Sequence, residues 1–240
     1  MIPPVLLYHK LDSPPPDAKL RGPYTPPQRF ARQMLYLKKR GFSFRTASEL
    51  VEHYRDHGRF PEKAVTITFD DGWRDNYTNG FPIFRELDIR PTIFLVASCV
   101  GSSSVKAVAE GESAREHLTA DQVREMSDWG VEFGSHTMNH AHLDRIPIDE
   151  ASLEIAGAKT AIEDLTQKPC KTLAYPAGFF NDEVKDIAAA AGHTAAFTTS
   201  YGKADKFDLF ELNRIEVLRR HLFLFQFRSN VLGQISVRAC

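Results

Sequence analysis

Cysteine is scarce in this sequence, and the few cysteines form no metal-binding or disulfide pattern. The chain of 240 residues has three, Cys99, Cys170 and Cys240, which are widely spaced and include no C-x-x-C pair. An odd number without paired spacing argues against a disulfide framework, and the missing C-x-x-C pair argues against a thiolate zinc site. We expect buried or incidental thiols.

An excess of either charge is also missing. Lysine and arginine together number 30 and aspartate and glutamate 31, so the formal net charge is -1. This balance provides no basic surface to attract nucleic acid or an anionic membrane. Neither is therefore expected as a partner, and the composition does not specify an oligomeric state.

Long apolar segments are absent as well. No window approaches the roughly eighteen consecutive apolar residues of a membrane-spanning helix, so no transmembrane segment is predicted. Residues 1–10 lack the basic start and long apolar core of a signal peptide. As the sequence stands we expect a soluble, cytoplasmic protein, whereas an export signal outside this sequence would make it extracytoplasmic.

The sequence does contain an alternation of strand and helix patterns. Strands are predicted at residues 5–8, 64–69, 92–96, 131–134, 171–175, 194–198 and 214–218, and helix N-caps at Thr25, Thr46, Asp75 or Asn76, Thr119 and Asn181. Alternating strands and helices indicate βα units and a parallel sheet, and about six to eight strands suggest a barrel. With no linker or repeat, residues 1–240 are predicted to form a single α/β domain.

Two carboxylates follow a predicted strand that is rich in β-branched residues. Residues 64–69 read Ala-Val-Thr-Ile-Thr-Phe, as expected of a strand buried on both faces, and Asp70, Asp71 and Gly72 come directly after it. Because ligands gather at the carboxyl ends of parallel strands, one aspartate could bind a metal while the other takes a proton. A simple turn is the alternative, since Asp and Gly favour turns.

Two histidines follow another predicted strand. His136 and His140 are four residues apart, which would place both imidazoles on one face of a helical turn, where Asp71 could join them as an oxygen ligand. Two histidines and one carboxylate leave positions open for water, as in catalytic metal sites. Taken alone, the pair could equally be capping or hydrogen-bonding surface residues.

Together the two motifs resemble a known family. Thr68-Phe69-Asp70-Asp71-Gly72 and His136-Thr137-Met138-Asn139-His140 are similar to the first two motifs of the polysaccharide deacetylases, the NodB-homology domain of carbohydrate esterase family 4. Tyr8-His9 near the start resembles the branch that acts on poly-N-acetylglucosamine. The resemblance implies a distorted (β/α) barrel of about seven parallel strands and metal-dependent removal of acetyl groups from a sugar.

The resemblance also implies roles for individual residues. Asp71, His136 and His140 correspond to the ligands of a divalent metal, most often Zn²⁺ but also Co²⁺, Ni²⁺ or Mn²⁺, and Asp70 corresponds to the general base. The backbone N–H of Ala177 corresponds to the group that stabilises the oxyanion.

The chain also departs from the family pattern. The family's usual base-orienting arginine is replaced by Ala174, and we expect Arg214 to orient Asp70 instead. No late histidine motif is evident, so His9 is the candidate general acid, with a histidine that merely caps a strand as the alternative.

Aromatic residues near the motifs could stack on sugar rings. Phe179 and Phe180, which follow a predicted turn, and Trp73 are the candidates, whereas Tyr175 is expected to be buried in a strand. The apolar run 222–227 is expected to form a buried terminal helix or strand.

The sequence therefore predicts a metal-dependent N-deacetylase of a glycan that contains N-acetylglucosamine. The alternatives are hydrolysis of another acyl group, such as an O-acetyl ester or a formamide on a lipid-linked sugar, and a catalytically silent carbohydrate-binding protein.

Overall fold

The computed structural model describes residues 3–16, 18–103, 115–199 and 207–218. Its core is a parallel sheet in the order β8-β7-β6-β5-β4-β3-β1-β9, with the short strand β2 paired to β3. The strands are β1 (Val5–Tyr8), β2 (Ser43–Phe44), β3 (Ala64–Phe69), β4 (Thr92–Leu95), β5 (Glu132–Ser135), β6 (Thr172–Ala174), β7 (Ala195–Thr198), β8 (Leu212–Asn213) and β9 (Ile215–Glu216).

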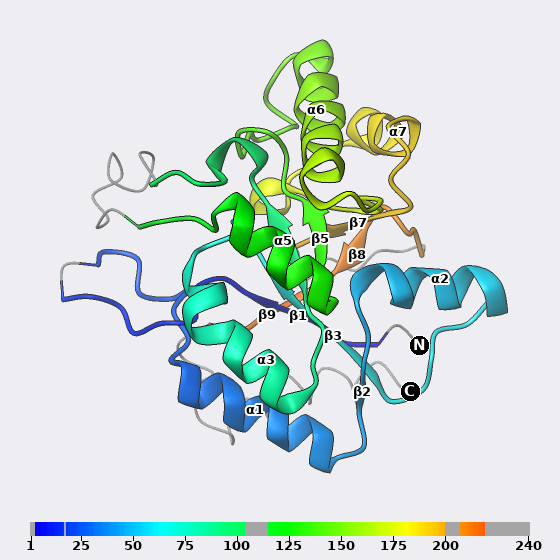
Figure 1. The fold of residues 1–240 in the computed structure, drawn as a ribbon. Helices are drawn as coiled ribbons and strands as arrows, with labels where there is room; N and C mark the ends of the chain where they lie inside the picture. The colour runs from blue at the N-terminus through cyan, green and yellow to red at the C-terminus, as the bar shows by residue number, and fades with distance from the viewer. Residues whose placement is uncertain (1–2, 17, 104–114, 200–206, 219–240) are drawn as a thin grey trace.

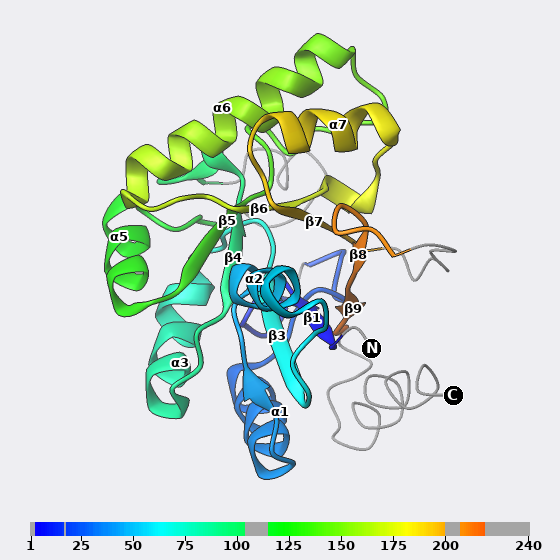
Figure 2. The ribbon, with the colours of Figure 1, turned by 90° about the vertical axis from the view of Figure 1, so that its right-hand side faces the viewer.

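One short segment nearly closes this sheet into a barrel. Strand β8 pairs with β7 at one edge, and β9 pairs with β1 at the other, so residues 212–216 span both edges with only Arg214 between the two pieces. Figure 2 shows the strands as a ring. The sequence predicted one strand from residue 214 to 218; the structure has two two-residue strands, because each edge pairs with a different part of the segment.

Helices surround the barrel (Figure 1). They are α1 (Pro27–Lys39), α2 (Ala47–His57), α3 (Phe81–Leu87), α5 (Ala120–Trp129), α6 (Ile148–Thr166) and α7 (Asp182–Ala190), with short turns η1 (Asn76–Gly80), η2 (Ala97–Cys99) and η3 (Pro176–Gly178). The predicted α/β barrel of parallel strands is thus confirmed. No helix among the described residues is both long and apolar enough to cross a membrane.

The apolar core is divided between the two sides of the sheet. One cluster joins α1, α3 and α5 to β1 and β3, another joins α6 and α7 to β6 and β7, and a third joins α2 to Phe94 and Phe197. All six residues of β3 are buried, as the run of β-branched and aromatic residues predicts for a strand that is covered on both faces.

Helix α2 covers the end of the barrel where the strands begin. At its N-terminus the backbone N–H of Ser48 donates to Glu132 Oε2 over 3.0 Å, and that of Ala47 donates to Thr92 Oγ1 over 2.8 Å. The Glu132 carboxylate also accepts hydrogen bonds of 3.0 Å from Thr92 and Thr172. A carboxylate at a helix N-terminus is favourable because the terminal N–H groups carry partial positive charge. Because α2 covers this end of the barrel, we expect the active site at the other end, where the strands finish.

Several helix ends follow the sequence prediction, and two do not. Thr46 and Thr119 both form the predicted capping boxes, and Asn181 caps α7. The prediction that Thr25 caps α1 is wrong, because the helix begins at Pro27 after an extended Pro26, without a side-chain cap. Neither Asp75 nor Asn76 caps a helix with its side chain. The Asp75 carboxylate accepts from the Leu11 backbone N–H and from Arg115, and the Asn76 amide donates to the His9 carbonyl. The apolar run 222–227 lies outside the described residues, and the prediction of a single domain remains a prediction.

Candidate active site

The two aspartates lie where β3 ends. Asp70 is buried, with 2% of its surface exposed, and Asp71 and Gly72 take left-handed backbone angles, with φ of 71° and 70°. A side chain at position 72 would place its Cβ 2.6 Å from Leu95 Cδ2, and together with the left-handed backbone this close approach favours glycine in the turn. The turn directs both carboxylates to the same end of the barrel.

The two histidines lie in the loop after β5, and the predicted helical turn is wrong. Thr137 and His140 have positive φ, 65° and 57°, which no helical turn allows. The backbone of the loop is held by Glu154 of α6, whose carboxylate accepts from the Asn139 backbone N–H over 2.8 Å and from its side-chain amide over 2.7 Å. The loop still brings the two rings together, with their centres 4.9 Å apart.

Asp71, His136 and His140 converge on one point. One ligand atom from each lies within 4.8 Å of the others, and Asp71 Oδ1 is 3.6 Å from the Nε2 atom of each histidine. His136 Nδ1 lies 2.7 Å from the carbonyl oxygen of Ala174, which can only accept, so Nδ1 carries the proton and Nε2 is left with a lone pair. Trp73 Nε1 donates to Asp71 Oδ2 over 2.9 Å, leaving Oδ1 to face the histidines.

Arg214 lies against Asp70. Its two terminal nitrogens donate to Asp70 Oδ1 over 2.6 Å and to Oδ2 over 2.7 Å, which is the bidentate geometry of a guanidinium with a carboxylate. The guanidinium lies over the Phe94 ring, 5.3 Å from its centre, and its Nε donates to the Thr198 carbonyl over 3.3 Å. Both members of the pair are buried.

These contacts set the charge of the two carboxylates. Burial by itself would raise the pKa of Asp70, but the charges of Arg214 and then His136 lower it below its usual range. Burial would likewise raise the pKa of Asp71, and the imidazoles of His9, His140 and His136 lower it well below its usual range. Both aspartates are therefore ionised at neutral pH.

His9 and Ala177 lie at the ends of two other strands. His9 follows β1, its carbonyl accepts a hydrogen bond of 2.9 Å from the Asn76 side chain, and its ring is close enough to influence both aspartates. Ala177, in the turn after β6, has a φ of 53°, a left-handed conformation that is unusual for alanine. Its carbonyl accepts from Thr199 Oγ1 over 3.0 Å, which fixes the peptide on one side.

The three aromatic candidates have different surroundings. Trp73 is only 6% exposed, and its ring stacks on His117 with the ring centres 4.4 Å apart. Its indole N–H donates to Asp71, so Trp73 positions Asp71 and has little surface for a sugar. Phe180 stacks on Tyr175 at 4.8 Å and packs against the core. Phe179 is 43% exposed and lies beside His142, so it alone of the three presents a wide surface for a sugar.

Sequence reasoning missed Glu154 and His117. Both are buried, and they support the site through Asn139 and Trp73 respectively. Glu154 lies fourteen residues beyond His140 inside a helical pattern, where a glutamate normally faces solvent. No sequence pattern distinguishes either residue, because only the folded chain brings each to its partner.

The sequence is similar to proteins of a known family. A family model described as Polysaccharide deacetylase matches residues 57–196. The chain is 28% identical over 215 residues to YxkH of Bacillus subtilis (strain 168), an alignment that covers 89% of this chain and 71% of YxkH. It is also 28% identical over 180 residues to the poly-beta-1,6-N-acetyl-D-glucosamine N-deacetylase of Staphylococcus aureus (strain MRSA252). That alignment covers 70% of this chain and 59% of the staphylococcal protein.

A solved structure has the same fold over nearly the whole chain. The Streptococcus pyogenes deacetylase PplD, in complex with acetate, superimposes with a TM-score of 0.79 and 27% sequence identity. The superposition covers 95% of this chain and 97% of PplD.

Proposed function

Because the chain belongs to the polysaccharide deacetylase family, we propose that it is a metal-dependent hydrolase that removes N-acetyl groups from an N-acetylglucosamine-containing poly- or oligosaccharide. One observation carries the proposal: a convergent Asp71, His136 and His140 lie beside a second aspartate, which Arg214 holds ionised. The staphylococcal relative is named for an N-acetylglucosamine polymer, and PplD binds acetate, the product of such a reaction.

The residues present fit a catalytic divalent metal. Because His136 carries its proton on Nδ1, its Nε2 atom has a lone pair for a metal. Trp73 donates to Asp71 Oδ2, so Asp71 Oδ1 points to where the three side chains meet. Three nitrogen and oxygen ligands suit Zn²⁺ best, with Co²⁺, Ni²⁺ and Mn²⁺ as other candidates. The bound metal would polarise the acetyl carbonyl and make a bound water more acidic.

The remaining residues would move protons and stabilise charge. Asp70 takes a proton from the attacking water as the water oxygen bonds to the acetyl carbon, and Arg214 keeps the Asp70 carboxylate aimed and ionised. The Ala177 N–H stabilises the oxygen that gains negative charge. His9 gives a proton to the sugar nitrogen as the C–N bond breaks, which releases acetate and a free amine.

Acetate release from N-acetylglucosamine oligomers tests this proposal. We expect wild-type protein to release acetate, to stop after metal removal by a chelator, and to recover when Zn²⁺ is restored. Asp70→Asn should bind the metal but release no acetate, while Asp121→Asn, a surface control on α5, should match wild type.

Two results would change the proposal. If metal-loaded wild type released no acetate from any N-acetylated glycan but hydrolysed another sugar acyl group, the substrate would be a different one. If it bound glycan with a filled metal site and hydrolysed nothing, the protein would be a silent binding module.

A further inference from the structure

Side chains, rather than the sheet, hold the backbone just beyond β1. The strand ends at Tyr8, whose carbonyl accepts from the Asp70 backbone N–H over 3.0 Å. The next carbonyl, that of His9, accepts instead from the side-chain amide of Asn76 over 2.9 Å. The carbonyl of the candidate general acid thus binds a side chain where the preceding residue binds a neighbouring strand.

The segment that follows the two aspartates of the candidate active site provides three such side chains. Besides Asn76, Asp75 accepts from the Leu11 backbone N–H at its Oδ1 atom over 2.8 Å. The Asn79 amide donates to the Leu11 carbonyl, also over 2.8 Å. Because the aspartates and these three side chains belong to one segment, residues 9–11 are fixed relative to the aspartates.

The contacts of Asn76 define the orientation of its amide. Asn76 is fully buried, and its Nδ2 atom donates both to the His9 carbonyl and, over 3.0 Å, to Asp75 Oδ1. Both partners can only accept when Asp75 is ionised, so the amide nitrogen faces them and the amide oxygen does not. The Oδ1 atom of Asn76 has no hydrogen-bond partner among the described residues. Asn76 therefore contributes through its two donors.

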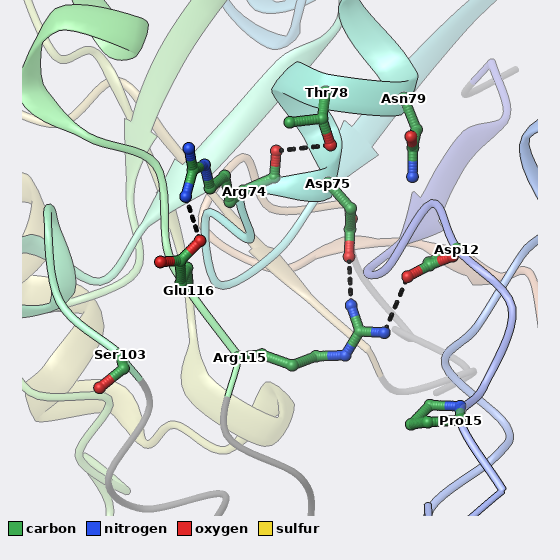
Figure 3. Close-up of a pocket in the computed structure, with 9 residues that line it drawn as sticks. All are labelled: Asp12, Pro15, Arg74, Asp75, Thr78, Asn79, Ser103, Arg115 and Glu116. Atoms are coloured by element: carbon green, nitrogen blue, oxygen red, sulfur yellow. Dashed lines mark hydrogen bonds and ion pairs between the residues drawn. The ribbon is translucent and has the colours of Figure 1, made fainter.

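Asp75 is itself held in place. It is 7% exposed, and Arg115 donates to its Oδ2 atom over 3.0 Å and to Asp12 over 2.9 Å, along the wall of a polar pocket (Figure 3). A buried carboxylate requires such a partner, because burial without one is costly. With Oδ2 bound to Arg115, Oδ1 is directed to the Leu11 N–H and to Asn76.

We propose that Asn76, oriented by Asp75, positions His9 for proton donation to the sugar nitrogen. Both are positioning residues, since their described contacts are with the backbone of residues 9–11. This inference rests on the proposed deacetylase function. As the C–N bond breaks, its electron pair moves to the nitrogen, which takes the proton of the His9 imidazolium. A displaced imidazolium would slow this step, because proton transfer requires hydrogen-bond distance.

A double-mutant cycle tests whether Asn76 acts through His9. Wild type, Asn76→Ala, His9→Ala and the double variant are compared by kcat and KM for acetate release from the N-acetylglucosamine pentamer, and melting temperatures verify folding. Asn79→Ala is the matched control. It removes the same kind of amide donor from the carbonyl of Leu11, two residues beyond His9.

We expect Asn76→Ala to lower kcat about 10- to 100-fold with KM within about twofold of wild type, because a displaced acid affects the chemical step. In the His9→Ala background the same substitution should lower kcat less than about twofold, since no imidazole is left to position. Asn79→Ala should keep kcat within about threefold of wild type.

Three results would overturn the inference. The first is wild-type kcat in a folded Asn76→Ala protein. The second is an equal loss with and without His9, which would mean that Asn76 acts on another part of the site. The third is an equal loss in Asn79→Ala, which would indicate general loosening of the segment.

A milder variant serves if Asn76→Ala does not fold. Asp75→Asn keeps the shape of the side chain but loses the charge that binds Arg115. We expect it to lower kcat about three- to tenfold, and this loss should likewise disappear in the His9→Ala background. A loss that persists without His9 would overturn the inference.

A failure of the proposed function gives a different result. In that case wild type releases no acetate from the pentamer, and the inference falls with the function because no amine leaves. If wild type releases acetate, the double-mutant cycle alone decides.

Discussion

Arg214 and Asp70 are 144 residues apart in the chain, yet two hydrogen bonds of 2.6 and 2.7 Å join them in the interior of the protein. Arg214 lies between the two short strands that bring the edges of the sheet together. The same segment that nearly closes the barrel therefore fixes the aspartate that we propose as the base. Barrel closure and activity should depend on one side chain.

We expect Arg214→Lys to lower kcat for acetate release about 100-fold, because a lysine ammonium cannot hold both carboxylate oxygens and a small displacement of a reacting group is costly. Arg214→Ala should be worse, and should also destabilise the fold by roughly 3–5 kcal/mol, since the buried Asp70 charge loses its partner. Activity assays and urea unfolding measure the two effects. Arg124→Lys, on the surface of α5, is the control, and wild-type kcat in Arg214→Lys would contradict the proposed role.

Much of the fold could be predicted from sequence, because its signals are local. The run of β-branched and aromatic residues in β3 indicates a strand covered on both faces, and capping boxes at Thr46 and Thr119 place the starts of α2 and α5. The convergence of Asp71, His136 and His140 could also be anticipated, since parallel strands present their carboxyl ends on one side.

The rest depends on contacts between distant segments. The histidine loop was predicted to be a helical turn because a spacing of four suggests one. Its actual backbone has positive φ at Thr137 and His140, with Glu154 of a later helix bound to Asn139 between them. The Arg115 contacts of the pocket likewise join segments far apart in sequence, for which no periodicity gives a signal.

Glu154 should therefore control metal affinity without touching the metal. In Glu154→Gln, the carboxylate charge and one of the two acceptor oxygens that bind Asn139 are lost, so the charge-assisted hydrogen bonds that hold the loop are weakened. We expect Zn²⁺ affinity to fall about 10- to 100-fold, the usual effect of losing support for a metal ligand. Competition with a chromogenic chelator measures this without any activity assay. Glu150→Gln, exposed on the same helix, is the control; equal affinities in the two variants would refute the role.

Buried His193 should make the protein less stable in mild acid. Burial lowers the pKa of His193 from 6.5 to about 4, with the nearby Lys159 as a further cause. Between pH 6.5 and about pH 4, His193 binds a proton in the unfolded chain but not in the folded chain. The free energy of unfolding is therefore highest above pH 6.5 and falls as the pH decreases through this range. From pH 7.5 to pH 5 we expect His193 alone to lower the free energy of unfolding by about 2 kcal/mol.

Urea unfolding of His193→Gln at the two pH values tests this expectation. The variant should lose about 2 kcal/mol less than wild type over the same range. His57→Gln, at an exposed position on α2, should behave as wild type. If His193→Gln retained the full pH dependence, the acid sensitivity would come from other groups.

Gly178, which follows Ala177, and Gly41 have nearly equal backbone angles but different surroundings. Comparing an alanine substitution at each position therefore distinguishes the effect of backbone strain from that of a steric clash. Gly178 has a φ of +77° and Gly41 of +78°, so alanine strains the backbone equally at both. A Cβ at Gly41 meets nothing within 4 Å, whereas at Gly178 it would lie 2.2 Å from Thr199 Oγ1 and 2.6 Å from the Thr199 backbone nitrogen. Gly41→Ala should cost about 1 kcal/mol, and Gly178→Ala at least about 2 kcal/mol more.

The clash at Gly178 should also reach the chemistry. Relief of the overlap requires the turn at residues 176–178 to move, and Ala177, whose N–H we assign to the developing oxyanion, lies in that turn. We expect Gly178→Ala to lower kcat about 100-fold under conditions where it remains folded, and Gly41→Ala to retain wild-type kcat. Equal unfolding free energies for the two variants would show that the turn adapts without strain. Wild-type kcat in a destabilised Gly178→Ala would instead mean that Ala177 does not contribute the oxyanion contact.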